Sequence, residues 1–465
     1  MKKITTLLTA IIGMAFMNQV SATHVTVEVP TAGQLSSLVQ NANCDSITIS
    51  GNLDGNDFWF IREQMPNLIY LNIGKVTVPD NKLPESGLYS KKALQKIILP
   101  DNLGTIGNHA FAYCSNLKDI TFPKSLVTIE YNAFYQSGLT EATLPDKLKN
   151  IGDAAFYECY NLKKVNFPEK LVSIGNSAFR QCNLSEIAFP DSLKAIGSNA
   201  FRYCQQLQKV TFPEKLETIG THAFNDCFRL HTATLKGKTA PVISDNTFNY
   251  TKVFYVPEGA AQTYKEAPNW SNLVIIDGNT PKKITVTLTT AGTLGEEILK
   301  QVDYVKQVNE LVINGPLNSD DFYQIQQQTT NLIAIDLIGA TIESLPENFF
   351  YERTALLDIK LPATLKNIGR YAFYRCHGLT QITIPEGVTN VGDYAFSECI
   401  SLKEIELPTT LTDIKNGAFQ NCWSLASIQI PDNVTTISQS SFYHCTSLIP
   451  VSYTHLRAHE TSAHL

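Results

Sequence analysis

The sequence predicts a mainly β solenoid, in which short repeats stack into two tandem arrays with α/β caps. Three observations in the 465-residue chain support this fold class. The motif Ala-Phe-x-x-Cys recurs many times, as in "AFAYC" at 110–114 and "AFYEC" at 155–159. The phenylalanines of these motifs follow one another at intervals of 22 or 23 residues. A proline recurs in phase with them, so a whole segment, and not the motif alone, is the repeated unit.

Each repeat is expected to contain one short strand and one helical turn. In the unit "NLKDITFPKSLVTIEYNAFYQS", apolar residues two apart at Ile120 and Phe122 suit a strand with one buried face. Pro123 then ends the strand, because proline lacks an N–H group and fixes φ. A glycine later in most units, such as Gly152, permits a tight bend with positive φ. The Ala-Phe-x-x-Cys segment is expected to form a single helical turn leading to the next strand.

The repeated apolar residues are expected to line one continuous core. A single unit buries too little apolar surface to offset the entropy lost on ordering it, so neighbouring units must stack. The expected core residues are Phe111, Phe134, Phe156, Phe179, Phe201, Phe224, Phe373, Phe396, Phe419, Phe442, Cys114, Cys159, Cys182, Cys204, Cys227, Cys376, Cys399, Cys422 and Cys445.

The ten cysteines permit two interpretations. In an exported chain they suggest a disulfide framework. All except Cys44 lie in phase with the repeat, however, and equivalent residues of stacked coils lie roughly 4.8 Å apart and point the same way. This geometry favours a column of buried thiols over bridges, whose Cβ atoms must face each other. The absence of Cys-x-x-Cys argues against a zinc site.

The chain also repeats on a larger scale, because the lead of each half is similar. "GNLDGNDF" at 51–58 matches "GPLNSDDF" at 315–322, and "NLIYLNI" at 67–73 matches "NLIAIDL" at 331–337. Each half is therefore expected to begin with an N-cap that covers the open end of its stack. The predicted segments are a signal peptide (1–22), an N-cap with a first imperfect repeat (23–93), array 1 (94–235), a C-cap and linker (236–280), a second N-cap (281–345), array 2 (346–449) and a non-native tail (450–465).

The first and last segments are interpreted from their composition. Residues 1–22 combine Lys2 and Lys3, an apolar stretch at 4–16 and the small-residue site Val20-Ser21-Ala22, which together indicate a signal peptide. The apolar stretch is too short to cross a bilayer comfortably, so a membrane anchor is the weaker interpretation, and we expect no membrane span. Residues 450–465 break the repeat pattern and are expected to be translated adapter or vector sequence.

Composition and motifs argue against several classes of function. The net charge of −6, without a basic run, argues against a nucleic-acid partner. The sequence has no Gly-x-Ser-x-Gly, Walker or dinucleotide motif, so we expect no enzyme activity and no cofactor. "HETSAH" at 459–464 has the wrong spacing for the zinc motif His-Glu-x-x-His. Asp57 and Asp321 could suggest paired carboxylates, but their equivalent places in the two caps favour a turn-forming role.

The repeat frame L-x-x-I-x-L-P-x-x-L-x-x-I-G-x-x-A-F-x-x-C resembles the BspA-like leucine-rich repeats of bacterial secreted and cell-surface proteins. The resemblance covers about 94–235 and 346–449, with Ser137 and Arg353 replacing cysteine in two units interpreted as weaker copies. It implies a leucine-rich-repeat solenoid. It also implies adhesion to host extracellular-matrix proteins, host cells or other bacteria. A secreted or cell-surface location in a Gram-negative-type bacterium is expected.

The outward side of the predicted strands is the candidate ligand-binding face, because solenoids commonly bind partners on such sheets. A merely solvated polar face is the alternative interpretation. The residues of this face are Asp119, Thr121, Glu141, Thr143, Lys164, Asn166, Glu186, Lys209, Thr211, Asp358, Lys360, Gln381, Thr383, Glu404 and Glu406.

Two functional hypotheses follow from these features. The first is a non-catalytic adhesin that binds a host matrix or cell-surface protein through the sheet. The alternative is a glycan-binding accessory protein of a gut-type bacterium, but no aromatic platform is expected on the sheet face. Tyrosines that follow the repeat phenylalanines are explained more simply by packing between coils than by recognition. These tyrosines are Tyr113, Tyr135, Tyr157, Tyr203, Tyr351, Tyr374 and Tyr443.

Overall fold

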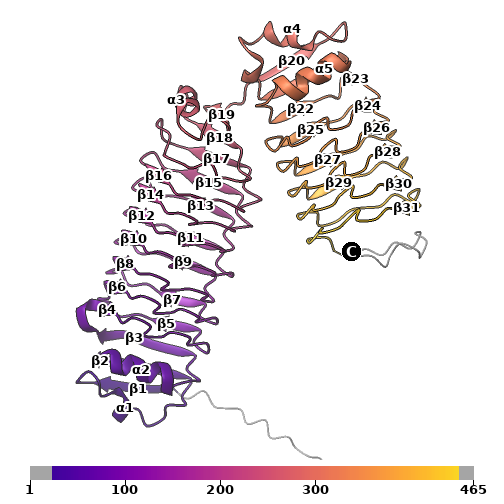
Figure 1. Ribbon diagram of the computed structural model, residues 1–465. Helices are drawn as coiled ribbons and strands as arrows, with labels where there is room; N and C mark the ends of the chain where they lie inside the picture. Colours follow the sequence, from indigo (N-terminus) through magenta and orange to yellow (C-terminus); the bar gives the residue numbers. More distant parts are fainter. Residues whose placement is uncertain (1–23, 450–465) are drawn as a thin grey trace, which may run out of the picture.

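The computed structural model describes residues 24–449, which form two stacks of coils (Figure 1). The predicted signal peptide and the predicted tail at 450–465 lie outside the described residues. The first stack runs from β1 (His24–Val29) to β19 (Val274–Asp277), and the second begins at β20 (Lys283–Thr287). In Figure 1 the second stack turns back, so that its coils lie beside the end of the first. The predicted mainly β solenoid is confirmed.

Each regular coil contributes two strands, one more than the sequence predicted. Three- or four-residue strands form a wide ladder, and two-residue strands form a narrow ladder on another side of the coil. The strand pairs within residues 24–449 are all parallel. The second strand was missed because it is only two residues long, too short to show an alternating pattern.

In the first stack, the N-cap strands continue directly into the wide ladder. The helices here are α1 (Leu35–Leu38), α2 (Gly55–Gln64), η1 (Pro79–Asn81) and α3 (Ala261–Glu266). The wide ladder holds β1, β2 (Ser46–Asn52), β3 (Tyr70–Thr77), β5 (Lys96–Ile98), β7 (Asp119–Thr121), β9 (Glu141–Thr143), β11 (Lys164–Asn166), β13 (Glu186–Ala188), β15 (Lys209–Phe212), β17 (Thr232–Leu235), β18 (Val253–Val256) and β19. The narrow ladder holds β4 (Lys82–Leu83), β6 (Thr105–Ile106), β8 (Thr128–Ile129), β10 (Asn150–Ile151), β12 (Ser173–Ile174), β14 (Ala195–Ile196) and β16 (Thr218–Ile219).

The second stack repeats this plan with fewer coils. Its helices are α4 (Leu294–Leu299), η2 (Val305–Gln307), α5 (Ser319–Tyr323) and η3 (Gln324–Gln328). Its wide ladder holds β20, β21 (Glu310–Pro316), β22 (Ala334–Asp336), β25 (Asp358–Lys360), β27 (Gln381–Thr383) and β29 (Glu404–Glu406), with β23 (Ala340–Thr341) paired to β21. Its narrow ladder holds β24 (Ser344–Leu345), β26 (Asn367–Ile368), β28 (Asn390–Val391), β30 (Asp413–Ile414) and β31 (Thr436–Ile437).

The Ala-Phe-x-x-Cys segment forms two consecutive tight turns, where the sequence suggested one helical turn. One left-handed residue precedes Ala-Phe and another precedes Cys, as with Asn199 (φ 57°) and Tyr203 (φ 61°). This backbone directs alternate N–H groups towards the next coil. Phe179 donates its N–H to the Ala200 carbonyl at 2.8 Å, for example. The turns therefore make a third hydrogen-bonded ladder, and the backbone groups of a coil are paired without a helix.

The recurrent glycine has a different role from the one predicted. Gly197 and Gly220 do not adopt positive φ, which contradicts the proposed bend. A Cβ at Gly197 would instead lie 2.6 Å from the backbone nitrogen of Asn176 in the preceding coil, and one at Gly220 would lie 2.4 Å from that of Ser198. Glycine is needed here because neighbouring backbones approach too closely for a side chain.

The repeat phenylalanines form a column of stacked rings through each array. Successive rings are nearly parallel, and Phe156 and Phe179 have centroids 5.1 Å apart at an interplanar angle of 5°. The column continues beyond array 1 to Phe248, and Trp270 of the C-cap is fully buried above it. Each stack has its own core, because the stacked phenylalanines of the two arrays fall into separate clusters.

The in-phase cysteines lie beside this column as free thiols. Each Sγ donates to a main-chain carbonyl in the preceding coil, as Cys204 does to Phe179 O at 3.2 Å. Burial raises the pKa of Cys204 and of Cys376 to about 12, so both thiols stay protonated at neutral pH. Cysteine suits this position because it is small, apolar and a weak hydrogen-bond donor.

We therefore expect the native protein to resist thiol alkylation. At pH 8, iodoacetamide should modify only the half-exposed Cys445 at an appreciable rate, because the other nine cysteines are buried. Unfolding in guanidinium without a reductant should then expose all ten thiols to the reagent, which mass spectrometry would count. Fewer than ten labels under those conditions, rising to ten after reduction, would show disulfides and contradict the thiol column.

Two basic residues replace cysteine where the column meets a cap. Arg353 occupies the cysteine position of its coil, and its guanidinium donates to the carbonyls of Thr329 and Gln326 at 2.8 Å each. Lys91 occupies the same place in the first stack and donates to the Met65 carbonyl. The preceding element is here a helix end, whose unpaired carbonyls need strong donors. Arg353 is thus a capping residue, and its coil is not the weaker copy that the sequence suggested.

Asp57 and Asp321 stabilise the two N-caps. Asp57 is buried and accepts hydrogen bonds from the backbone nitrogens of Gly33 (2.6 Å), Leu35 (2.9 Å) and Asp54 (3.0 Å). Asp321 accepts the equivalent three bonds in the second half. Both residues complete a capping box at the start of a helix, which confirms the turn-forming role preferred from the sequence.

Candidate functional site

The wide ladder presents the sheet face, defined as the fifteen outward residues predicted above. All of them are exposed except Thr211, which is half-buried. Their outward direction follows from the strand pleat, because the residues between them, such as Ala142 and Val210, are buried in the core. Parallel pairing places equivalent residues of neighbouring coils side by side, as with Glu186 and Lys209.

In array 1 the sheet face consists of two columns with different chemistry. The first column places opposite charges on neighbouring coils in several pairs, since Glu141 pairs in register with Lys164, and Glu186 with Lys209. An ion pair of 2.6 Å between Lys96 and Asp119 begins the same column. The second column holds short uncharged side chains, namely Thr121, Thr143, Asn166, Ala188 and Thr211. The result is a flat polar strip with little net charge.

The sheet face of array 2 is more acidic. Its outward residues include Asp358, Glu404 and Glu406 but only one base, Lys360. Lys360 lies 3.4 Å from Asp336, and Thr383 donates to Glu406 at 2.9 Å. The two arrays therefore offer different surfaces to a ligand.

The tyrosine stripe packs between coils, as the simpler interpretation predicted. The centroid of the Tyr135 ring lies 5.0 Å from that of Tyr113 and 5.2 Å from that of Tyr157. The Arg180 guanidinium continues the stripe, lying 5.3 Å from the Tyr157 centroid and 5.6 Å from that of Tyr203. These contacts hold the turns of successive coils in register.

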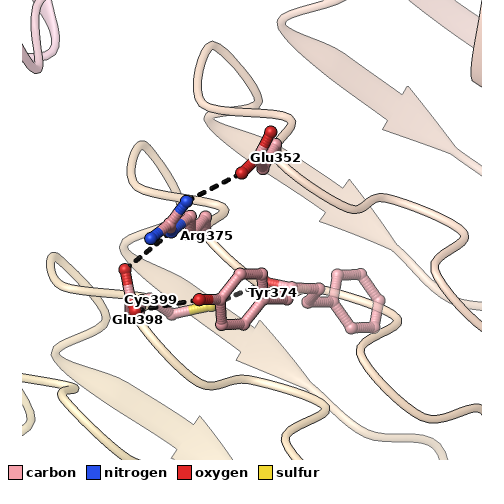
Figure 2. Close-up of polar contacts among 6 residues, drawn as sticks. Glu352, Tyr374, Arg375, Glu398 and Cys399 are labelled. Atoms are coloured by element: carbon pink, nitrogen blue, oxygen red, sulfur yellow. Dashed lines mark hydrogen bonds and ion pairs between the residues drawn. The ribbon is translucent and has the colours of Figure 1, made fainter.

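In array 2 the stripe carries an ion-pair network (Figure 2). Arg375 lies between two carboxylates, 2.8 Å from Glu352 and 2.8 Å from Glu398. The Tyr374 hydroxyl donates to Glu398 at 2.9 Å. Burial, together with this hydrogen bond, raises the pKa of Tyr374 to about 12. The network links three consecutive coils, as Figure 2 shows. Its hydrogen bond from the Tyr374 hydroxyl to Glu398 holds the tyrosine ring in place.

Surface hollows lie among the tyrosines of residues 24–449, and two of them were not predicted from the sequence. One, of ≈ 360 Å³, lies in array 1 between Tyr160, Tyr203 and three glutamines. The larger, of ≈ 640 Å³, lies at the start of array 2 and is lined by Tyr351, Tyr371 and Tyr374. Both combine tyrosine rings with carboxamide side chains. The spacing of the tyrosines shows in the sequence, but the hollows depend on how the turns and the cap meet.

The junction between the two stacks brings together residues that the sequence analysis did not single out. The rings of Phe228 and Trp423 have centroids 5.4 Å apart, and Ser401 donates its hydroxyl to the Phe228 carbonyl at 3.2 Å. His231 and His377 are both half-buried here, and desolvation lowers the pKa of each to about 4. A small apolar cluster around Val253, Val274, Ile276 and Ile333 completes the contact.

A signal for this junction exists in the repeat itself. The residue directly after the repeat cysteine is polar in most of array 1, as in Ser115 and Gln205. In array 2 the same position holds Ile400 and Trp423. Apolar residues at an otherwise polar repeat position indicate a covered surface.

Residues 24–449 contain neither a cluster of metal ligands nor a helix that could cross a membrane. Within residues 24–449, no three His, Cys, Asp or Glu side chains gather closely enough to hold a metal ion. Every helix over the same residues is too short or too polar to cross a membrane.

Stacked parallel coils with a phenylalanine column and an outward polar sheet define a leucine-rich-repeat solenoid. The sequence profile described as "BspA type Leucine rich repeat region" matches in six copies, over residues 81–205, 172–267 and 322–454. These matches cover more than half of the chain. The protein therefore belongs to the BspA-type leucine-rich-repeat family.

Several solved structures are similar to this chain at low sequence identity. A leucine-rich repeat protein from Bacteroides ovatus is 22% identical, with 90% of this chain and 89% of that chain covered and a TM-score of 0.37. A leucine-rich cell surface protein from Faecalibacterium prausnitzii is 20% identical, with 93% and 87% covered and a TM-score of 0.33. A leucine-rich repeat protein from T. pallidum is 23% identical, with 43% and 78% covered and a TM-score of 0.26. A search of curated proteins found no match.

Membership of the family sets the general class of function. BspA-like leucine-rich-repeat proteins are bacterial cell-surface proteins, and leucine-rich-repeat proteins bind protein partners. Members of the family are typically non-catalytic.

Proposed function

We propose that this protein is a secreted or cell-surface adhesin that binds a host matrix or cell-surface protein through the sheet face of array 1. The observation that supports the proposal most directly is the exposure of the same outward positions on coil after coil. The second array's sheet face extends the binding surface, and no catalytic step is involved.

The sheet face suits protein recognition for physical reasons. The strands are held by parallel ladders and by the buried phenylalanine column, so little backbone entropy is lost on binding. Short side chains such as Thr121 and Thr143 let a partner approach closely, while the acidic and basic residues of the first column set its register. Many weak contacts along the ladder then add up, as is usual for solenoids.

The proposal is tested by a grouped substitution on the sheet face. The full chain would be screened for binding to immobilised fibronectin, fibrinogen, collagen and laminin by biolayer interferometry. Replacing Glu141, Lys164, Glu186 and Lys209 together with alanine should weaken binding by at least about tenfold, because four complementary charges are lost.

A matched control removes the same charges elsewhere. Asp146, Lys147, Glu169 and Lys170 are also exposed, lie on the coils of Glu141 and Lys164 and follow the repeat prolines away from the sheet face. Their joint replacement with alanine should change the affinity less than about twofold. Equal losses in both variants, or binding that survives the first substitution, would move the site away from the sheet.

A further inference from the structure

The larger hollow lies where the second N-cap meets the first coils of array 2. Its volume is ≈ 640 Å³, within the range of about 300 to 1,000 Å³ usual for small-molecule sites. Gln326 and Gln327 of η3 form one wall, and Glu347 and Asn348, which follow β24, form another. Tyr351 lies in the same turn as Asn348, and Tyr371 and Tyr374 lie in the turn of the next coil.

These rings make an aromatic corner. Tyr351 and Tyr374 stack at 5.1 Å with an interplanar angle of 26°. Tyr371 stands edge-on to Tyr374, at 5.4 Å and 76°. The corner is rigid, because Tyr374 is bound to Glu398 and the Arg370 guanidinium covers Tyr371 at 4.6 Å. Tyr371 also stacks on Tyr394 at 5.3 Å, and the Arg375 guanidinium lies 5.1 Å from the Tyr374 centroid. The ring open to a ligand is therefore that of Tyr351, which is 42% exposed and held in position by Tyr374.

Several polar groups around the corner have no partner within the protein. Among the hydrogen bonds and ion pairs of residues 24–449, none uses the side chains of Gln327, Glu347 or Asn348 or the hydroxyl of Tyr351. The one charged donor of the hollow, Arg353, already donates to backbone carbonyls of the cap. The free groups thus offer carboxamide donors and acceptors and one carboxylate.

The first half lacks the aromatic corner at the equivalent place. The segment "GRYAFYRC" at 369–376 aligns with "GNHAFAYC" at 107–114. His109 therefore stands in place of Tyr371, and Ala112 in place of Tyr374. The two rings that complete the corner are particular to array 2.

The polar wall also differs between the halves. "QQQ" at 326–328 aligns with "REQ" at 62–64. Arg62 and Glu63 form an ion pair of 2.7 Å, and Arg62 also donates to the Ser86 carbonyl at 2.7 Å. These charged groups satisfy one another in the first half, whereas Gln327 is free in the second.

We propose that this hollow binds a short, neutral oligosaccharide. The C–H face of a sugar ring packs well on a tyrosine face, and its hydroxyls need partners that both donate and accept. The carboxamides of Gln327 and Asn348 do both, and the Glu347 carboxylate accepts from two neighbouring hydroxyls. A phosphate, sulfate or uronate would be repelled by the Glu347 carboxylate, and Arg353, the one base among the residues that line the hollow, is already engaged by cap carbonyls. The site is independent of the sheet face and of the function proposed for it.

The test is affinity electrophoresis of the full chain in native gels. The gels would contain soluble β-glucan, mannan, galactan or arabinoxylan as neutral probes, and heparin or polygalacturonate as acidic ones. At least one neutral polysaccharide should retard the chain, and no acidic one should do so more strongly. Tyr351→Ala and Gln327→Ala should each weaken the retarding interaction at least about tenfold.

Tyr89→Ala is the matched control, because Tyr89 holds the position of Tyr351 in the first half. This variant should bind the polysaccharide as the parent chain does. Tyr351 is 42% exposed, so its removal should leave the melting temperature nearly unchanged, and Gln327→Ala provides a second folded variant.

Three outcomes would overturn the proposal. They are the absence of retardation by any neutral polysaccharide, preference for an acidic one, and binding that survives both variants. Loss of matrix-protein binding in Tyr351→Ala without any polysaccharide binding would also overturn it, and would show a protein ligand instead. None of these results affects the sheet-face test, whose variants lie in array 1.

Discussion

Replacing Phe179 with alanine is expected to lower the free energy of unfolding of array 1 by about 3 to 5 kcal/mol. Phe179 is fully buried in the middle of its column, 5.1 Å from Phe156 and 5.3 Å from Phe201. Phe167 packs edge-on to the same ring at 5.5 Å. Alanine would leave a cavity that cannot collapse, because the three ladders fix the spacing of the coils.

The loss should be confined to the first stack. The phenylalanine columns of the two arrays belong to separate hydrophobic cores, so the unfolding transition of array 2 should not shift. Guanidinium unfolding followed by circular dichroism and by tryptophan fluorescence would separate the transitions. Trp59 and Trp270 belong to the first stack, and Trp423 belongs to the second, where its contact with Phe228 also makes it sensitive to the junction.

Val172→Ala is the control for this experiment. Val172 belongs to the same array but is 38% exposed, so its truncation should cost less than about 0.5 kcal/mol. A loss below about 1 kcal/mol for Phe179→Ala would contradict a continuous core, since it would mean that each coil is stabilised without its neighbours.

Acidification from pH 7 to pH 4.5 is expected to separate the two stacks at their junction. Desolvation lowers the pKa of His231 and of His377 to about 4 in the closed protein, against an ordinary value near 6.5. The neighbouring positive charges of Lys252, Lys403 and Arg375 act in the same direction, and Glu398 partly offsets them at His377.

The sign follows from proton binding. Between about pH 6.5 and pH 4 the open state binds more protons than the closed one, so the stability of the junction falls as the pH falls. The stability that the junction has with both histidines uncharged is fully present above pH 6.5, and it is lost as the pH approaches 4. Each histidine contributes about 2 to 3 kcal/mol of this loss at pH 4.5. Both side chains are half-buried, so solvent screening reduces this figure.

Opening would be measured by small-angle X-ray scattering and by the fluorescence of Trp423. The contact of Trp423 with Phe228 joins the two stacks, so it is lost when the junction opens. The double variant His231→Phe, His377→Phe should stay closed over this pH range. His109→Phe, His222→Phe is the matched control, because these half-buried histidines lie within array 1, and it should open as the parent chain does. A radius of gyration of the parent chain that is the same at pH 7 and pH 4.5 would refute the prediction.

The sequence determined the repeated core. The period of the phenylalanines and cysteines predicted which side chains are buried, because every coil must present the same apolar residues to its neighbours. The alternation in each strand predicted the outward sheet residues as well. Single positions such as Gly197 were misread, since the sequence shows that glycine is required but not whether a positive φ or a close backbone contact requires it.

Only the tertiary structure decided which non-repeating residues meet. Phe228 and Ser401 are 173 positions apart, and no local pattern relates them, because their contact depends on the turn that the chain makes between the stacks. The tyrosine hollow likewise depends on where η3 lies against the first coils of array 2. The periodic packing can be predicted from the sequence because each coil repeats the same local contacts. The junction and the hollow each occur once, and they arise from the placement of whole coils and caps.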